Sequence, residues 1–291
     1  MLRTPPAARP FVHVLLFALA ALVALAGCRS APPTEQVDLS SRLDGIDATF
    51  VVRDLATGVT RVHRPERAAM PLTPASTFKI PNSIIGLETG VLADAGTVIA
   101  WDPVRDPVAD DQPEAWKGDQ TLASAFRLSC VWYYRELARR IGAERMQDWI
   151  DRLGYGNRSI EGGIDLFWLR GGLRISALEQ VGFLERLVTH RLPVRPATEA
   201  TLREIMLIES TPAYRLYGKT GTAVPSETEQ IGWLVGYVEV RGRTSVFAFN
   251  MIDPRVWQDF PRERRVAIVK GLLASMGVLP AQADPTTQAG G

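Results

Sequence analysis

Residues 75–81 read ASTFKIP and place a serine, Ser76, three positions before a lysine, Lys79. On a helix, residues at this spacing share one face, so the two side chains can meet. A serine hydroxyl is a poor nucleophile unless a neighbour accepts its proton, and a lysine accepts protons only where its surroundings disfavour the ammonium form. The same letters also fit an ordinary helix start, with a capping serine and a solvated lysine. Pro81 disfavours the helical conformation at Ile80 and predicts a distorted first turn.

A second motif, Lys219-Thr220-Gly221, lies in a segment that predicts a late strand. Alternation along a strand puts Lys219 and Gly221 on one face and Thr220 on the other. Gly221 would let a ligand approach the backbone closely, although the triplet alone also fits a glycine bulge with an incidental lysine. S-x-x-K followed by K-T-G is the signature of the serine β-lactamases and penicillin-binding proteins, and the two motifs occur here in that order.

The middle motif of this chain is Ser129-Cys130-Val131, where that group usually has Ser-x-Asn. With Val131 in place of the asparagine, the chain resembles the class D, or oxacillinase-type, β-lactamases. The resemblance runs in order from about residue 40 to 278. It also rests on four further stretches: Tyr155-Gly156-Asn157, Phe167-Trp168-Leu169, GGLRISALEQ (171–180) and GWLVGYVE (232–239).

The resemblance implies a role for each motif residue. Ser76 would be the nucleophile that opens a β-lactam ring and becomes the acyl-enzyme. Lys79, carboxylated by CO₂ to N6-carboxylysine, would be the general base of both half-reactions, since no glutamate base for deacylation is evident. Ser129 would pass a proton to the departing lactam nitrogen, and Lys219 would lower the proton affinity of Ser129 electrostatically.

The expected neighbours of Lys79 explain why it would be modified. Phe78, Val131, Trp168 and Leu169 would surround the amine with apolar groups, and desolvation lowers its pKa and leaves a neutral nitrogen that reacts with CO₂. The Trp168 indole N–H is a donor that could hold the carbamate. The same side chains would in any case belong to the core. CO₂ or bicarbonate is required for this chemistry, and no other cofactor is expected.

Every substrate of this class carries a carboxylate, which implies a cationic subsite. Thr220 and Lys219 would bind the carboxylate together with an arginine of the closing helix, whose planar fork suits it. Arg265 fits the family's spacing to the end of that helix best, and Arg262 and Arg264 remain alternatives.

The backbone N–H groups of Ser76 and Thr222 would form the oxyanion hole. Thr222 stands where many relatives carry an aromatic residue, which affects the preference for substrate side chains and leaves the chemistry unchanged. Together with residues 102–118, it would set the substrate spectrum.

The bulk composition excludes several other classes. The 291 residues carry a net charge of +1, without the basic excess that is typical of nucleic-acid-binding proteins. The three histidines are not spaced as metal ligands, so no metal site is expected. A small-molecule ligand fits best, bound to a monomer or a homodimer.

Residues 1–28 predict an export signal. Val14–Gly27 is an apolar run of signal-peptide length, shorter than the roughly 20 residues of a spanning helix. Leu25-Ala26-Gly27-Cys28 resembles a bacterial lipobox, so Cys28 would be lipidated and anchor a periplasmic protein to the membrane, with a simple secretory signal as the alternative. Residues 29–40 would form a polar tether. Cys130 would then be left alone, without an internal disulfide.

The pattern of elements predicts an α/β fold of the α+β type, like that of serine β-lactamases and penicillin-binding proteins. Both chain ends would build one central antiparallel sheet flanked by helices, with a mostly helical lobe inserted between them and a ligand cleft between the lobes. The catalytic domain would span 41–279 and a disordered tail 280–291. The expected strands are 47–53, 58–63, 213–223, 230–240 and 243–252, and the expected helices begin near 76 and cover 121–142, 144–156, 176–190 and 261–277.

Three rival functions share some of these features. A penicillin-sensing domain would acylate without turnover. A cell-wall transpeptidase or carboxypeptidase would usually keep the asparagine of the middle motif. A structural lipoprotein would have no reason to keep two serines and two lysines in motif register.

Overall fold

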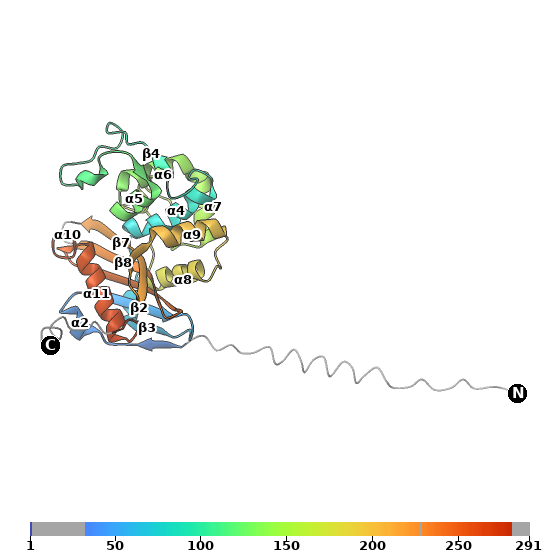
Figure 1. Ribbon diagram of the computed structural model, residues 1–291, viewed down its shortest axis with the longest axis vertical. Coiled ribbons are helices and arrows are strands. Elements are labelled where there is room, and N and C mark those ends of the chain that lie inside the picture. The colour runs from blue at the N-terminus through green and yellow to red at the C-terminus, as the bar shows by residue number, and fades with distance from the viewer. Residues whose placement is uncertain (2–32, 227–228, 281–291) are drawn as a thin grey trace. The chain divides into compact units, whose positions relative to one another are not determined.

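The computed structural model describes residue 1 and residues 33–226 and 229–280. The predicted signal segment, the lipidation of Cys28 and nearly all of the predicted tail lie outside these residues. From Thr34 onward the chain forms one compact unit around a seven-stranded sheet of order β1-β3-β2-β9-β8-β7-β6 (Figure 1). The strands are β1 (Thr34–Gln36), β2 (Ala48–Asp54), β3 (Thr60–His63), β6 (Leu207–Ser210), β7 (Tyr214–Ser226), β8 (Glu229–Val240) and β9 (Arg243–Ile252).

The sheet joins the two ends of the chain, as predicted. Strand β2 pairs antiparallel with β3 on one side and with β9 on the other, where Phe50 lies opposite Phe249. Strands β7, β8 and β9 form an antiparallel meander. Arg241 and Gly242 turn the last hairpin with positive φ angles of 50° and 79°, the geometry that matches the twist of the strands.

The start of the sheet corrects the predicted tether over 29–40. Thr34–Gln36 form β1 and pair in parallel with β3 at the edge of the sheet, and α2 (Ser40–Leu43) follows. All three residues of β1 are exposed, so the strand has no apolar alternation that the sequence could reveal. The folded unit therefore begins before residue 41.

Helices cover both faces of the sheet (Figure 1). Helix α8 (Ala177–Val188) packs against β2, β8 and β9, and α11 (Arg262–Ser275) packs on the other face against β8 and α2. Ser176 caps α8 by accepting a hydrogen bond from the Glu179 N–H, while the Glu179 carboxylate accepts one from the Ser176 N–H. One core cluster lies on each side of the sheet.

The inserted lobe is mostly helical, as predicted, and lies next to β7, toward the end of the sheet opposite β1 (Figure 1). Its helices are the 3₁₀ turn η1 (Ala75–Phe78), α4 (Lys79–Glu88), α5 (Leu122–Leu128), α6 (Val131–Ile141), α7 (Ala143–Leu153) and α9 (Pro196–Ile205). Helix α9 and strand β6 had not been predicted individually. The remaining short elements are α3 (Pro65–Ala68), β4 (Val98–Ile99), η2 (Glu114–Trp116), β5 (Gln120–Thr121) and α10 (Val256–Asp259).

The predicted helix over 121–142 is two helices with a break where its pattern is irregular. Ser129 ends α5 in the left-handed conformation, with φ of 57°. The N–H groups of Ser129 and Cys130 donate to the carbonyls of Phe126 and Ala125, which satisfies the end of α5. A non-glycine residue in this conformation costs roughly 1–2 kcal/mol, so the surrounding packing must hold it there.

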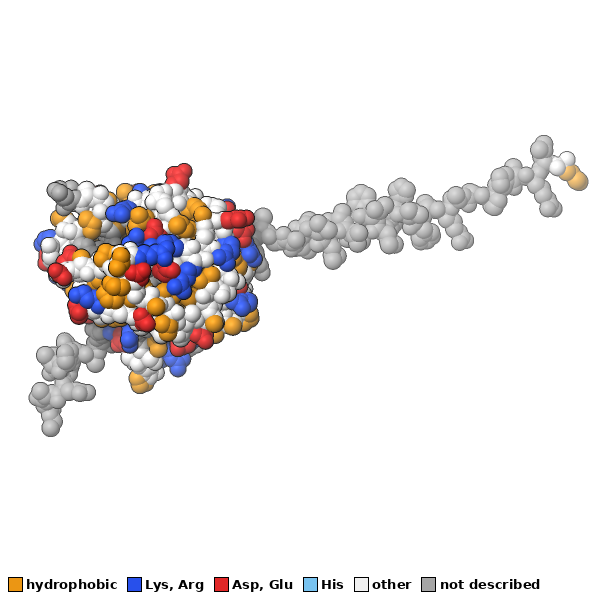
Figure 2. Space-filling model, turned by 90° about the horizontal axis from the view of Figure 1, so that it is seen from above, with side chains coloured by type: hydrophobic (Ala, Val, Ile, Leu, Met, Phe, Trp, Pro, Cys, Tyr) orange, Lys and Arg blue, Asp and Glu red, His pale blue; other side chains and the backbone are white. Residues whose placement is uncertain are grey.

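The surface matches the near-neutral charge of the chain. Basic and acidic side chains are interspersed over the face seen in Figure 2. Within the described ranges, no helix combines the length and the apolar character needed to span a bilayer.

Candidate active site

Ser76 and Lys79 meet at the start of α4. Ser76 lies in η1, whose tighter turns agree with the distortion predicted from Pro81. The Lys79 Nζ donates a hydrogen bond of 2.8 Å to the Ser76 Oγ, and the two residues are only 1% and 9% exposed. The sequence therefore builds a buried hydroxyl–amine pair and no solvated lysine.

Strand β7 lies directly against η1 and brings the second motif to this pair. A Cβ atom placed on Gly221 would lie 2.9 Å from the Pro74 carbonyl oxygen and 3.2 Å from the Thr77 nitrogen, so a side chain there would collide with the turn. The backbone of Lys219-Thr220-Gly221 therefore lies in close contact with η1, and this contact requires a glycine at position 221.

Two residues that the motif analysis did not single out hold η1 in place. The Gln180 amide on α8 donates to the Thr77 Oγ1 at 3.0 Å and to the Tyr155 hydroxyl at 3.1 Å. The Trp233 indole on β8 donates to the Thr73 carbonyl at 3.0 Å. Both residues lie in stretches that resemble class D enzymes, and their roles depend on contacts across more than 100 residues of sequence.

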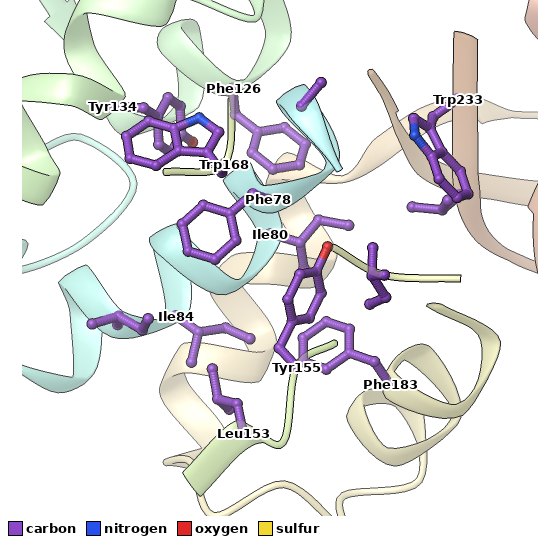
Figure 3. Close-up of a cluster of buried hydrophobic side chains, with 14 of the residues drawn as sticks. Phe78, Ile80, Ile84, Phe126, Tyr134, Leu153, Tyr155, Trp168, Phe183 and Trp233 are labelled. Carbon is purple, nitrogen blue, oxygen red and sulfur yellow. The ribbon is translucent and has the colours of Figure 1, made fainter. Parts of the chain in front are cut away.

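The amine of Lys79 lies in a desolvated environment. Burial lowers the pKa of Lys79 to about 7, so a large fraction of the amine is neutral near neutral pH. Phe78, which lies between Ser76 and Lys79 in the chain, stacks on Trp168 with ring centroids 5.4 Å apart (Figure 3). Val131 and Leu169 are half-buried and pack against the same cluster. The four side chains predicted around Lys79 thus belong to this cluster or pack against it.

Three further polar groups near Lys79 had not been predicted. The Lys79 Nζ lies 5.3 Å from the centroid of the Tyr134 ring. The Tyr134 hydroxyl and the Ser83 Oγ are 2.9 Å apart, and that Oγ donates to the Lys79 carbonyl at 2.7 Å. Burial raises the pKa of the Cys130 thiol to about 11, so it stays neutral beside the lysine. Ser83 lies four residues after Lys79 and Cys130 lies within the middle motif, whereas Tyr134 had no comparable sequence signal.

Ser129 and Lys219 form a second hydroxyl–amine pair. The Lys219 Nζ donates to the Ser129 Oγ at 3.0 Å and to the Thr220 carbonyl at 3.0 Å. Burial, and after it the charge of Lys79, lower the pKa of Lys219 well below that of a free lysine. The helix break at Ser129 therefore presents its hydroxyl to the strand that carries Lys219.

The structure separates the three arginines considered for the substrate carboxylate. Arg265 is buried and donates to the carbonyls of Gly221 and Trp233, and burial lowers its pKa to about 10, which leaves it cationic at neutral pH. Arg264 instead lies over the ring of Phe260. Arg262 lines a cavity that also contacts Lys219 and Thr220. Arg264 is thus turned away from the motif residues, and Arg265 and Arg262 are not.

Hydrogen bonds to Asn157 hold the ends of the loop that carries Trp168. The Asn157 amide donates to the Gly172 carbonyl at 2.9 Å and accepts from the Arg174 N–H at 2.9 Å. A Cβ on Gly156 would lie 2.1 Å from the Arg174 carbonyl oxygen. Gly156 and Asn157 therefore close this loop, while Tyr155 packs edge-on against Phe78 with ring centroids 5.7 Å apart.

Two arginines of α6 tie the same loop to the segment over 102–118. Asp165, three residues before Trp168, pairs with Arg135 at 2.9 Å and with Arg139 at 2.7 Å. Asp106 pairs with Arg135 at 3.2 Å and also with Arg139. Trp168 is therefore held by an ionic network as well as by packing.

Together these residues can perform acyl transfer. Ser76 has an amine within hydrogen-bonding distance, and Ser129 with Lys219 forms a second hydroxyl–amine pair of a type that can donate a proton. Arg265 and Lys219 supply positive charge for an anion. Within the residues that the structure covers, no three side chains of the types that bind metals are grouped as a metal site would require.

Comparison with known proteins agrees with this geometry. The family model described as the penicillin binding protein transpeptidase domain matches residues 22–274. The probable β-lactamase YbxI of Bacillus subtilis is 40% identical over 218 residues, which are 75% of this chain and 79% of that protein. β-Lactamase OXA-10 of Pseudomonas aeruginosa is 37% identical over 245 residues, covering 84% of this chain and 90% of that protein.

Solved structures show the same similarity. The crystal structure of the class D β-lactamase YbXI from Nostoc superposes with a TM-score of 0.77 at 37% identity and covers 84% of this chain and all of that one. The class D β-lactamase of Bacillus subtilis gives a TM-score of 0.74 at 37% identity, over 83% of this chain and 96% of that one.

Proposed function

This chain belongs to the class D β-lactamases, and we propose that it hydrolyses β-lactam antibiotics of the penicillin and oxacillin type through an acyl-enzyme at Ser76. In this proposal the general base of both steps is Lys79 after carboxylation. The observation that carries it is the buried contact between the Lys79 Nζ and the Ser76 Oγ, combined with the pKa of about 7 that burial gives Lys79.

The first step of the proposed reaction forms the acyl-enzyme. The neutral amine of Lys79 adds to CO₂ and releases a proton, which gives a carbamate that can accept a proton from the Ser76 Oγ. That oxygen attacks the lactam carbonyl carbon, and the N–H groups of Ser76 and Thr222 stabilise the oxyanion. The ring C–N bond breaks, and the nitrogen receives a proton from Ser129, which Lys219 holds at 3.0 Å. The proton that the carbamate took from Ser76 then passes to Ser129, which restores both groups for the second step.

The second step releases the product. The carbamate takes a proton from a water molecule that attacks the ester carbonyl, the ester bond breaks, and the Ser76 Oγ regains its proton. Thr220, Lys219 and Arg265 would bind the carboxylate of the substrate in both steps. Arg265 is favoured over Arg262 because it is anchored to the Gly221 carbonyl, next to the reacting groups.

The decisive experiment is turnover of nitrocefin and oxacillin in the presence and absence of bicarbonate. We expect many turnovers per enzyme, a loss of rate when CO₂ is stripped, and recovery when bicarbonate is added. CO₂ reacts only with the neutral amine, so at constant dissolved CO₂ the carbamate should also be lost as pH falls through about 7, the pKa of Lys79. A single stoichiometric burst would instead identify a penicillin-sensing domain, and turnover indifferent to CO₂ would remove Lys79 carboxylation from the mechanism.

Replacing Trp168 by phenylalanine tests the environment of the carbamate. Phenylalanine can keep the stacking on Phe78 but lacks the indole N–H that would hold the carbamate. We expect the bicarbonate concentration for half-maximal oxacillin turnover to rise by about 10-fold, in line with the worth of one hydrogen bond to a charged group. Saturating bicarbonate should restore most of the activity, which serves as the control for folding. A titration identical to that of the unaltered protein would contradict this role.

We also propose that the protein is exported to the periplasm and anchored through a lipid on Cys28. This proposal rests on the sequence of the first 28 residues alone. The mass of the mature N-terminus tests it, because lipidation adds acyl chains to Cys28 and a simple signal cleavage does not.

A further inference from the structure

A cavity of about 320 Å³ opens beside Lys219 and Thr220 and contains none of Ser76, Ser129 or Thr222 in its lining. It lies between α5, the end of α9, the start of β6, strand β7 and the beginning of α11. Its volume is at the lower end of the range that holds small ligands. It therefore adjoins the expected carboxylate subsite without including the nucleophile.

The charged side chains of this cavity are mostly basic. Lys219 is buried, Arg262 is half-buried and Arg127 is exposed, and the Arg262 guanidinium donates to the Arg127 carbonyl at 3.2 Å. Within the described residues, none of these three cations takes part in an ion pair. Glu204 is the acidic residue of the lining, and it is exposed and likewise without an ion pair in that part of the chain.

Lys219 is repelled by other cations around it. The charges of Lys79, Arg262 and Arg265 all contribute to lowering the pKa of Lys219, after burial. Three cations against one exposed carboxylate, Glu204, leave the lining with an excess of positive charge, which favours an anion in the cavity. The single carboxylate of a β-lactam would satisfy Lys219 and Arg265 and leave Arg262 and Arg127 without a counter-charge.

The order of residues along β7 sets the direction in which a substrate lies. Thr222 would face the lactam carbonyl, Lys219 and Thr220 would face the carboxylate, and Gly218 lines the cavity. Each residue advances the strand by about 3.3 Å, so the cavity begins where the carboxylate subsite ends, on the side away from the reacting carbonyl. A substituent on the ring carbon next to the carboxylate-bearing carbon would enter it.

We propose that this cavity is a second anion-binding subsite, in which Arg127 and Arg262 select β-lactams that carry an acidic substituent beside the ring carboxylate. Dianionic cephalosporins are the corresponding substrate class. The proposal rests on the proposed function, because the ring is oriented by acylation at Ser76. Arg127 and Arg262 are here specificity-determining residues and have no part in the bond-breaking steps.

Steady-state kinetics with two cephalosporins test this subsite. The pair shares one acylamino side chain and differs only in a neutral or a carboxylate-bearing substituent on the ring. We expect the Arg127→Gln/Arg262→Gln double variant to raise KM for the acidic compound by about 10-fold and to change KM for the neutral one by less than about 2-fold. KM for the acidic compound should rise with salt in the unaltered enzyme only.

Arg152→Gln is the matched control, because it removes a positive charge from the exposed face of α7. It should leave both KM values unchanged. Equal shifts for the two compounds in the double variant, or no shift for either, would overturn the subsite.

Equilibrium binding to Ser76→Ala separates this proposal from the proposed function. The variant cannot be acylated, so its affinities for the two cephalosporins report the cavity even if the unaltered protein never turns over. Preference for the acidic compound that is lost with Arg127 and Arg262 supports the subsite. Equal affinities for the two compounds count against it, whatever the turnover experiment gives.

Discussion

Turnover of a penicillin is expected to fall by about 1,000- to 10,000-fold when Lys79 is replaced by alanine, because the reaction then loses the base of both half-reactions. The Lys79 Nζ is the group within hydrogen-bonding distance of the Ser76 Oγ at 2.8 Å. If slow acylation still occurs, the ester should accumulate, since deacylation needs the same base. Steady-state kinetics and intact-mass measurement of the adduct on Ser76 check both expectations.

The control for this variant is Ser76→Ala, which should show no adduct at any time. Added bicarbonate should stimulate the unaltered enzyme and leave Lys79→Ala unaffected. Turnover in Lys79→Ala near the original rate would show that another group serves as the base. The nearby Cys130 thiol is a poor candidate, because burial raises its pKa to about 11.

Replacing Asp106 by alanine is expected to lower the free energy of unfolding by about 3 kcal/mol, the typical cost of breaking a buried ion pair. Asp106 is 3% exposed and pairs with both Arg135 and Arg139. Its removal leaves Arg135 with Asp165 and Arg139 with Asp165 and Glu136, and it releases the segment over 102–118. Urea unfolding measures the loss, which corresponds to about 6–12 °C in Tm for a domain of this size.

Asp110→Ala is the matched control for this measurement, because Asp110 lies in the same segment and is exposed. Its removal should change stability by less than about 0.5 kcal/mol. A similar small loss for Asp106→Ala would mean that Asp165 and Glu136, which also pairs with Arg139 at 3.0 Å, suffice to hold the two arginines.

The reacting groups could be predicted because the chemistry fixes both residue types and spacing. Ser76 and Lys79 are three positions apart, and the K-T-G triplet marks the strand that Lys219 occupies. The contacts that position these groups could not be predicted. Gln180 and Tyr134 act through hydrogen bonds between distant segments, and one sequence has no local signal for such contacts.

The same distinction applies to the fold. The meander of β7, β8 and β9 could be predicted because its apolar residues and its turn at Arg241-Gly242 are local signals. Strands β6 and β1 are short and largely exposed. They form because each pairs with the free edge of a longer strand, β7 and β3 respectively. The arginine that would bind the substrate carboxylate likewise could not be chosen from the sequence, because the choice depends on the residues around each arginine of α11.

The close approach of β7 to its neighbours limits how this enzyme can evolve. Gly218 and Gly221 would each place a Cβ less than 3.0 Å from a backbone oxygen, at 2.6 Å from Val235 and 2.9 Å from Pro74. Mutation at these two positions would have to displace backbone, which at Gly221 belongs to the turn that carries Ser76. Thr222 is half-buried and Val224 is 52% exposed, so both have room for larger side chains. New substrate ranges are therefore expected to arise by selection at the end of the strand and in the surrounding loops, while the glycines stay fixed.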